Sequence, residues 1–156
     1  MDSTDFKILK ILQEKARIPN VEVSRAIGMA PSAVLERIKK LEAQGIIDGY
    51  EVRLNPGRFH RSMIAFIHIQ ISPPSMSRET GAILAGLDEV QEVHFLAGDD
   101  CFLVKLRVKD TTELEAIIRN RIAAIKAVTS TKTFVCLSTY KETARIPLSD
   151  IAVSDM

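Results

Sequence analysis

The sequence predicts an α+β protein in two parts: an N-terminal group of three short helices, and a C-terminal domain whose elements follow the order βαββαβ. Apolar residues recur at helical spacing up to Gly45. From Met63 onward, runs that alternate as strands do are separated by two amphipathic segments. Apolar residues make up 46% of the 156 residues, which is enough to form cores and argues against disorder.

The first two helices are predicted over residues 5–16 and 21–27, because apolar and charged side chains alternate there with a helical period. Pro19 separates the two, and Asn20 is the expected N-cap of the second. Gly28 is the expected C-terminal stop of that helix.

A third helix is predicted from Pro31, which suits a first helical turn, to about residue 44. A turn and a short strand follow over residues 46–54, and Asn55-Pro56-Gly57 is a strong turn signal. We therefore expect a first domain over residues 1–54, a linker over 55–61, a second domain over 62–140 and a tail over 141–156.

The second domain is predicted to hold four strands and two helices. The strands are expected over residues 63–71, 90–97, 102–108 and 130–137, and the helices over 77–87 and 112–125. A turn is expected at Gly98-Asp99-Asp100. Two split βαβ halves indicate a ferredoxin-like antiparallel sheet with both helices on one face.

The second and third helices, joined by a tight turn, have the form of a helix-turn-helix, whose second helix enters the major groove of DNA. Val34, Ile38 and Leu41 fall on one face of the third helix, and small Ser24 permits the two helices to approach closely. The opposite face carries the candidate DNA-binding residues. Ser32, Ala33 and Glu36 are expected at base edges, and Arg37, Lys39 and Lys40 at phosphates.

Charge gives this interpretation modest support. Residues 1–61 hold 11 Lys and Arg against 8 Asp and Glu, a balance of +3, whereas the remaining 10 against 12 give −2. The alternative is that the same helix face is simply solvated, and composition alone does not choose between the two.

Several motifs resemble the leucine-responsive regulator (Lrp/AsnC) family, and together they cover nearly the whole chain. They are Asp5-x-x-Ile8-Leu9, Ala16-Arg17-Ile18-Pro19, Ala26-Ile27-Gly28-Met29-Ala30-Pro31-Ser32, Arg37-Ile38-x-x-Leu41-Glu42-x-x-Gly45-Ile46-Ile47-x-Gly49-Tyr50, Val90-x-Glu92-Val93-His94 and Val128-x-x-Thr131-x-Thr133. The resemblance implies a transcriptional regulator that binds double-stranded DNA. It further implies a homodimer assembled through the C-terminal sheets, often a tetramer or octamer, and an amino acid or related effector bound between C-terminal domains.

Matched to the family's motif, the effector-binding residues are Gly98, Asp99, Asp100, Cys101, Thr131 and Thr133. Three positions depart from the family pattern. Ala30 replaces an N-capping Ser, a loss of about 1 kcal/mol; Glu36 stands where several relatives are basic; and Cys101 occupies the Asp position of the family's turn. Either Asp99 or Asp100 compensates, or the effector differs, or none is bound.

Two other functions remain open from the residues. A sirohaem-decarboxylase-like enzyme shares the architecture, but the stretch from Gly45 to Tyr50 fits the regulators instead. His68 and His94 are expected to be structural, and although Cys101 and His94 suggest a thiol–imidazole pair, no third orienting group is evident. An oligomeric metabolite sensor without DNA binding is the other alternative.

The remaining sequence features exclude more than they indicate. Cys101 and Cys136 lie far apart without a CxxC motif, so we expect no metal, disulfide or cofactor. The N-terminus has no apolar segment of a signal peptide, and no run is long enough to span a bilayer. A cytoplasmic protein that is not an enzyme and has no membrane association is therefore predicted.

Overall fold

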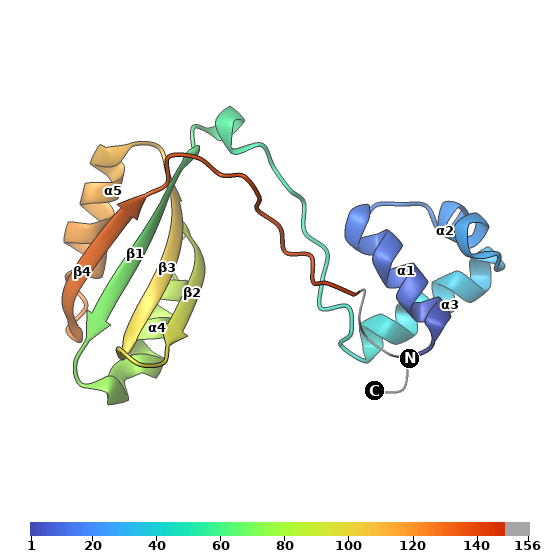
Figure 1. Cartoon of the computed structure of the whole chain (residues 1–156), viewed down its shortest axis with the longest axis horizontal. Helices are drawn as coiled ribbons and strands as arrows, with labels where there is room; N and C mark the ends of the chain where they lie inside the picture. The colour runs from blue at the N-terminus through green and yellow to red at the C-terminus, as the bar shows by residue number, and fades with distance from the viewer. Residues whose placement is uncertain (149–156) are drawn as a thin grey trace. The chain divides into compact units, whose positions relative to one another are not determined.

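The computed structural model describes residues 1–148. The chain forms two compact units (Figure 1). One unit contains residues 1–53 together with the returning segment 142–148, and the other contains residues 54–141. Residues 149–156, the end of the predicted tail, lie outside the described residues.

The first unit is a bundle of three helices, α1 (Ser3–Glu14), α2 (Asn20–Ile27) and α3 (Pro31–Ala43). Its core is a small apolar cluster to which all three contribute: Ile8, Leu12, Val23, Val34 and Ile38. The predicted inward face of α3 is confirmed, since Val34, Ile38 and Leu41 are all buried. Ser24 is buried as well, and its hydroxyl donates to the Val21 carbonyl at 2.8 Å.

The helix ends follow local capping chemistry. α1 begins earlier than predicted because Asp2 accepts hydrogen bonds from the N–H groups of Thr4 and Asp5, while the Asp5 carboxylate accepts from the Asp2 N–H. The expected N-cap at Asn20 is wrong: Pro19 holds that position without a side-chain hydrogen bond, and Asn20 is already helical. Gly28 adopts the left-handed conformation (φ 73°) that ends α2, as predicted.

The predicted strand over residues 46–54 is wrong. These residues form no strand in the structure, because a strand needs a hydrogen-bonded neighbour and this stretch has none among the described residues. Ile46 and Ile47 instead donate their N–H groups to the Leu41 carbonyl and close the end of α3. The predicted turn after it is confirmed: Asn55 caps the short 3-10 helix η1 (Pro56–Phe59).

The second unit confirms the βαββαβ order. Its elements are β1 (Met63–Ile71), the 3-10 turn η2 (Pro74–Met76), α4 (Ser77–Ala85), β2 (Val90–Leu96), β3 (Cys101–Val108), α5 (Thr111–Ile117), the π-helical turn η3 (Ile118–Ile122) and β4 (Val128–Val135). The strands form one antiparallel sheet in the order β2-β3-β1-β4, the ferredoxin-like arrangement that the pattern predicted.

The second predicted helix of this unit is shorter than its apolar pattern suggests. The α-helical part ends at Ile117, and one wider turn follows, in which the Ala123 N–H donates to the Ile118 carbonyl five residues earlier, at 2.8 Å. The apolar period continues through this turn, so Ile122 and Ile125 are still buried.

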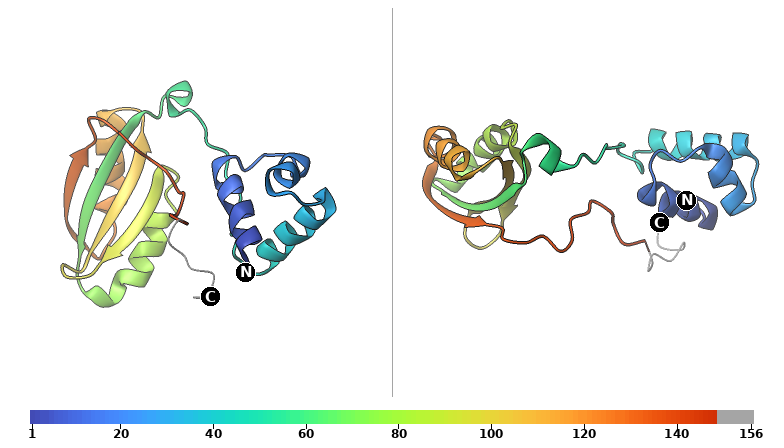
Figure 2. Two further views of the ribbon diagram at one scale, coloured as in Figure 1. Left: turned by 45° about the vertical axis from the view of Figure 1, so that its right-hand side comes forward. Right: turned by 90° about the horizontal axis from the view of Figure 1, so that it is seen from above.

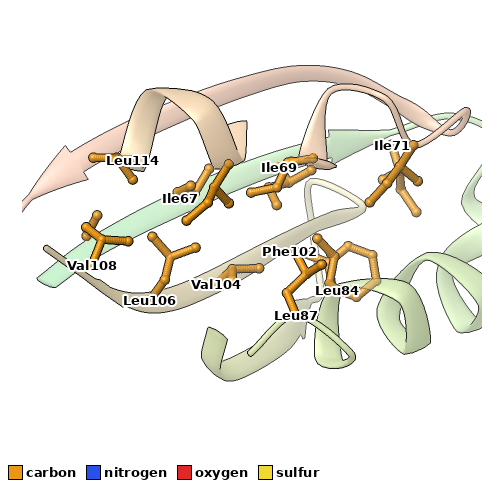
Figure 3. Packing of buried hydrophobic residues seen from close by; sticks show 14 of the residues in the cluster. Ile67, Ile69, Ile71, Leu84, Leu87, Phe102, Val104, Leu106, Val108 and Leu114 are labelled. Atoms are coloured by element: carbon orange, nitrogen blue, oxygen red, sulfur yellow. The ribbon is translucent and has the colours of Figure 1, made fainter. Parts of the chain in front are cut away.

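Both helices cover the same face of the sheet (Figures 1 and 2). In β1 the residues with odd numbers, such as Ile67 and Ile69, point into this core. They meet Leu84 of α4, Leu87 just after that helix, and Leu114 of α5 there (Figure 3). The even-numbered residues of β1 point to the other face, which neither helix covers. Among the described residues, no helix is long and apolar enough to cross a membrane.

Candidate DNA-binding and effector sites

The outer face of α3 presents the residues predicted to contact DNA. Ser32, Glu36, Lys39 and Lys40 are exposed, and Ala33 is half-buried. Lys39 and Lys40 have no ion partner in the part of the chain that the structure describes, so their charges are available to an anion. The helix starts at Pro31 after Ala30, which offers no side-chain acceptor, so the first-turn N–H groups remain unsatisfied by a cap.

Arg37 differs from the neighbouring cations because it already has two carboxylate partners. Its Nη1 atom lies 2.7 Å from the Asp2 carboxylate and 2.7 Å from that of Asp5. The N–H of Asp5, followed by Arg37, lowers the pKa of Asp2, and the carboxylates of Asp5 and Asp2 raise the pKa of Arg37. The start of α1 is thus pinned to the middle of α3, which fixes the orientation of the recognition helix.

The end of α3 has a second polar contact. The Tyr50 hydroxyl donates to the Glu42 carboxylate at 2.9 Å, and partial burial together with this carboxylate raises the pKa of Tyr50 to about 12. Sequence reasoning predicted no contact for Asp2 or Tyr50. The signal for Asp2 was present, since Asp2-x-x-Asp5 before an apolar run is the pattern of a capping box.

The predicted effector turn lies between β2 and β3. Gly98 has φ 108°, a conformation that side chains rarely adopt, and Asp100 also has a positive φ of 47°. Gly98, Asp99 and Asp100 are exposed. The Gln70 side chain donates to the Asp99 carbonyl at 2.9 Å and ties the turn to β1.

Cys101 is buried, with 1% of its surface exposed, and its Sγ lies 2.8 Å from Nε2 of His68. The suggested pair with His94 is therefore wrong, and so is the expectation that His94 packs inside the protein. His94 is exposed and lies 3.4 Å from the Glu92 carboxylate. Burial, then the charges of Asp99 and Asp100, raises the pKa of the Cys101 thiol, which disfavours the thiolate that nucleophilic chemistry needs.

Thr131 and Thr133 lie on β4, opposite Ile69 and Ile67 of β1. Directly paired residues point to the same face, so both threonines lie on the helix-covered face. Cys101 pairs with Gln70 and points to the other face. Because β1 also separates β3 from β4, the structure does not bring the six predicted effector residues together in one chain.

The uncovered face of the sheet is partly apolar. It carries Phe66, Leu96, Leu103 and Phe134, and Phe66 stands directly opposite Phe134. Phe134 is 49% exposed, with the Lys132 ammonium 5.2 Å from its ring centre. Lys105 is buried on the same face and lies 2.8 Å from Glu92. We call this surface the open sheet face.

Comparison with known families and proteins agrees with this architecture. Residues 1–48 match the family described as winged helix-turn-helix DNA-binding, and residues 64–146 match the Lrp/AsnC ligand binding domain. The leucine-responsive regulatory protein of Haemophilus influenzae is 34% identical over 145 residues, 92% of this chain and 87% of the relative. The Escherichia coli K12 protein of that name is 33% identical over 148 residues, 94% and 90% of the two chains.

Solved structures agree as well. A transcriptional regulator from Neisseria meningitidis in complex with L-methionine has a TM-score of 0.90 at 30% identity, covering 96% of this chain and 97% of its own. AsnC of Escherichia coli has a TM-score of 0.85 at 26% identity, covering 94% and 99%. Two domain matches, close relatives along almost the whole chain and a shared fold lead to one conclusion. The chain belongs to the Lrp/AsnC family of DNA-binding transcriptional regulators, which are not enzymes.

Proposed function

We propose that this regulator binds a pseudo-palindromic DNA site as a homodimer or larger assembly, and that an amino acid controls the assembly. Each dimer places two copies of α3 in successive major grooves, roughly one helical turn apart. Assembly compensates for the modest charge of one DNA-binding unit, because two linked units bind with a high effective concentration. The site of action is the cytoplasm.

The open sheet face is the observation that supports assembly. Phe66 and Phe134 stand opposite each other in the register of β1 and β4, on a face that neither helix of the unit covers, and Phe134 leaves about half of its surface exposed. A second copy packed face to face buries these rings and completes a two-layer sheet core. A dimer is the first product, with a tetramer or octamer as the larger assembly.

On DNA, the exposed residues of α3 divide by position. Ser32, Ala33 and Glu36 lie in its N-terminal half, which usually reaches the base edges, and the Glu36 carboxylate accepts from a cytosine amino group. Lys39 and Lys40 contact phosphates. Arg37 contributes to phosphate binding with the donors that Asp2 and Asp5 leave unused, and it keeps α3 oriented while doing so.

The effector site is completed by a second protomer. The turn of Gly98, Asp99, Asp100 and Cys101 comes from one copy and Thr131 with Thr133 from another, because one chain presents these groups at separate places. Relatives crystallised with L-methionine, from Neisseria meningitidis and Mycobacterium tuberculosis, support an amino acid as the ligand. Since the Cys101 thiol is buried against His68, the carboxylates of Asp99 or Asp100 take the ammonium group.

Selection of random-sequence DNA by the purified full chain at two salt concentrations tests the proposal. We expect enrichment of a motif with two-fold symmetry and binding that weakens steeply as salt rises. Mass measurement with and without L-methionine and L-leucine tests the effector. Folded protein that enriches no sequence, or that stays monomeric at micromolar concentration, contradicts the proposal.

A further inference from the structure

The C-terminal end of α1 binds a segment from the other end of the chain. Ile146 donates its N–H to Oε1 of Gln13 at 2.8 Å, and Nε2 of Gln13 donates back to the Ile146 carbonyl at 3.3 Å. Arg145 donates to the Glu14 carbonyl at 3.3 Å. Leu148 and Lys10 complete a shallow groove of about 230 Å³ around these contacts.

The chemistry of these contacts is that of peptide binding. One amide side chain has one donor and one acceptor in fixed geometry, so Gln13 satisfies both backbone groups of Ile146 together. The last carbonyls of a helix have no partner inside the helix, and a cation there is favourable for the helix dipole. At Glu14, Arg145 provides both a hydrogen-bond donor for a terminal carbonyl and a positive charge near the end of the helix. α1 has no basic residue of its own in its last turn.

The path of the chain gives this contact a consequence. Residues 142–148 belong to the first unit although they follow β4 of the second, so the chain passes between the units twice, near residue 54 and near residue 141. β4 carries Thr131 and Thr133 of the proposed effector site and Phe134 of the open sheet face. The second passage therefore connects these residues to α1 through a short stretch of chain.

The other end of α1 carries the contacts with the recognition helix. Asp2 and Asp5 hold Arg37 of α3 at 2.7 Å, and α1, with 12 residues, is about 18 Å long. A single rigid helix thus contacts the returning segment through Gln13 and Glu14 and contacts α3 through Asp2 and Asp5. A displacement of one end is transmitted to the other.

We propose that residues 145–148 form a latch on the Lys10–Gln13–Glu14 surface of α1, and that this latch couples the ligand-binding unit to the recognition helix independently of the linker at 55–61. The latch itself stands on the contacts above. Its effect on DNA binding rests on the proposed function, because it assumes a dimer that binds two half-sites.

Hydrogen exchange of the full-length protein, followed by NMR at the Ile146 amide, tests the latch directly. Gln13→Ala removes both hydrogen bonds, Gln13→Glu keeps the acceptor but loses the donor, and Lys7→Ala alters an exposed residue of α1 outside the groove. We expect the Ile146 amide to exchange about tenfold faster in Gln13→Ala, at an intermediate rate in Gln13→Glu and unchanged in Lys7→Ala. An Ile146 amide that exchanges in the unaltered protein as fast as in an unstructured peptide overturns the latch.

DNA binding tests the coupling. Without the latch, the returning segment no longer ties the end of β4 to α1, and the longer free connection penalises simultaneous contact with two half-sites. Gln13→Ala is expected to weaken binding to the selected two-half-site DNA about five- to tenfold, while half-site binding stays within twofold. If Gln13→Ala binds each of the two DNAs as tightly as the unaltered protein does, the coupling is overturned. An unaltered protein that binds neither DNA refutes the proposed function and the coupling with it, whereas Ile146 exchange still decides the latch.

Discussion

The two units of the chain are stabilised in different ways. The helical unit has a cluster of five buried apolar residues and relies on polar contacts at its helix ends, including the ion pairs of Arg37. The sheet unit has a cluster of fifteen among the described residues, yet one of its faces is left uncovered. The DNA-binding unit is therefore complete within one chain but has little core to lose, whereas the sheet unit has a large core and lacks a partner surface.

The largest expected effect is on assembly. Phe134→Asp places a charge in the proposed interface, and we expect it to weaken the dimer at least about 100-fold, since an unpaired buried charge costs several kcal/mol. Ile83→Asp is the matched control, because Ile83 is 43% exposed, close to the 49% of Phe134, but lies in the helix layer. Sedimentation over a concentration series is the measurement; a Phe134→Asp dimer as tight as the unaltered one contradicts assembly through the open sheet face.

The difference in core size predicts unequal tolerance of the same substitution. Ile8→Ala and Ile69→Ala each remove a fully buried isoleucine, at about 2–5 kcal/mol. In the helical unit that loss approaches the stability of the whole unit, so Ile8→Ala is expected to unfold it and abolish DNA binding while the sheet unit stays folded. Calorimetry, combined with NMR of backbone amides from each unit, distinguishes the two. One transition shifted equally by both substitutions argues that the units do not unfold independently.

The exposed charges of α3 predict an effect on DNA binding. Lys40→Ala is expected to weaken binding to all sequences and to reduce the slope of log affinity against log salt by about 0.9, the contribution of one phosphate contact. Glu36→Gln is expected to change sequence preference more than affinity. Lys15→Ala, at the exposed end of α1, serves as the control. An unchanged salt slope in Lys40→Ala excludes the phosphate contact.

The smallest expected effect concerns the contacts of Arg37 at low pH. The pKa of Asp2 is lowered in the folded protein, so its contribution to stability is present above the ordinary aspartate pKa of about 3.9 and disappears as the pH falls through the lower, folded value. Arg37→Gln should therefore be less stable than the unaltered protein at pH 7 and approach it in strongly acidic solution. Urea unfolding across this range measures the difference, and a constant difference down to the lowest pH contradicts the assignment.

The sequence predicted what depends on local pattern. The bounds of β1 match the prediction because its alternation is regular from Met63 to Ile71. β4 was predicted two residues too late, since its start is set by the pairing of Val128 with Ile71 beside a register shift, which no local pattern reveals. The strand expected over residues 46–54 failed for a similar reason, because pairing depends on a distant partner.

In the candidate sites, too, features set by local pattern were predicted and contacts with distant segments were not. The exposed face of α3 followed from its helical period, but the partners of Arg37 lie more than 30 residues away in the sequence. The position of Cys101 on the open sheet face depends on the register of β3 against β1, which places its thiol beside His68. Contacts between distant segments were therefore the part that sequence reasoning missed.

The strand order has a consequence for the behaviour of the protein at high concentration. β2 and β4 are the edges of the sheet, and exposed edges are templates on which other chains polymerise. Both edges carry exposed polar or charged side chains, among them Glu92 and His94 on β2 and Ser130 and Lys132 on β4, beside the exposed apolar side chains of Phe95, Phe134 and Val135. The polar and charged side chains resist the addition of further strands. Assembly through the open sheet face, as proposed above, pairs the same surface of both copies, and such an interface closes instead of extending into fibres.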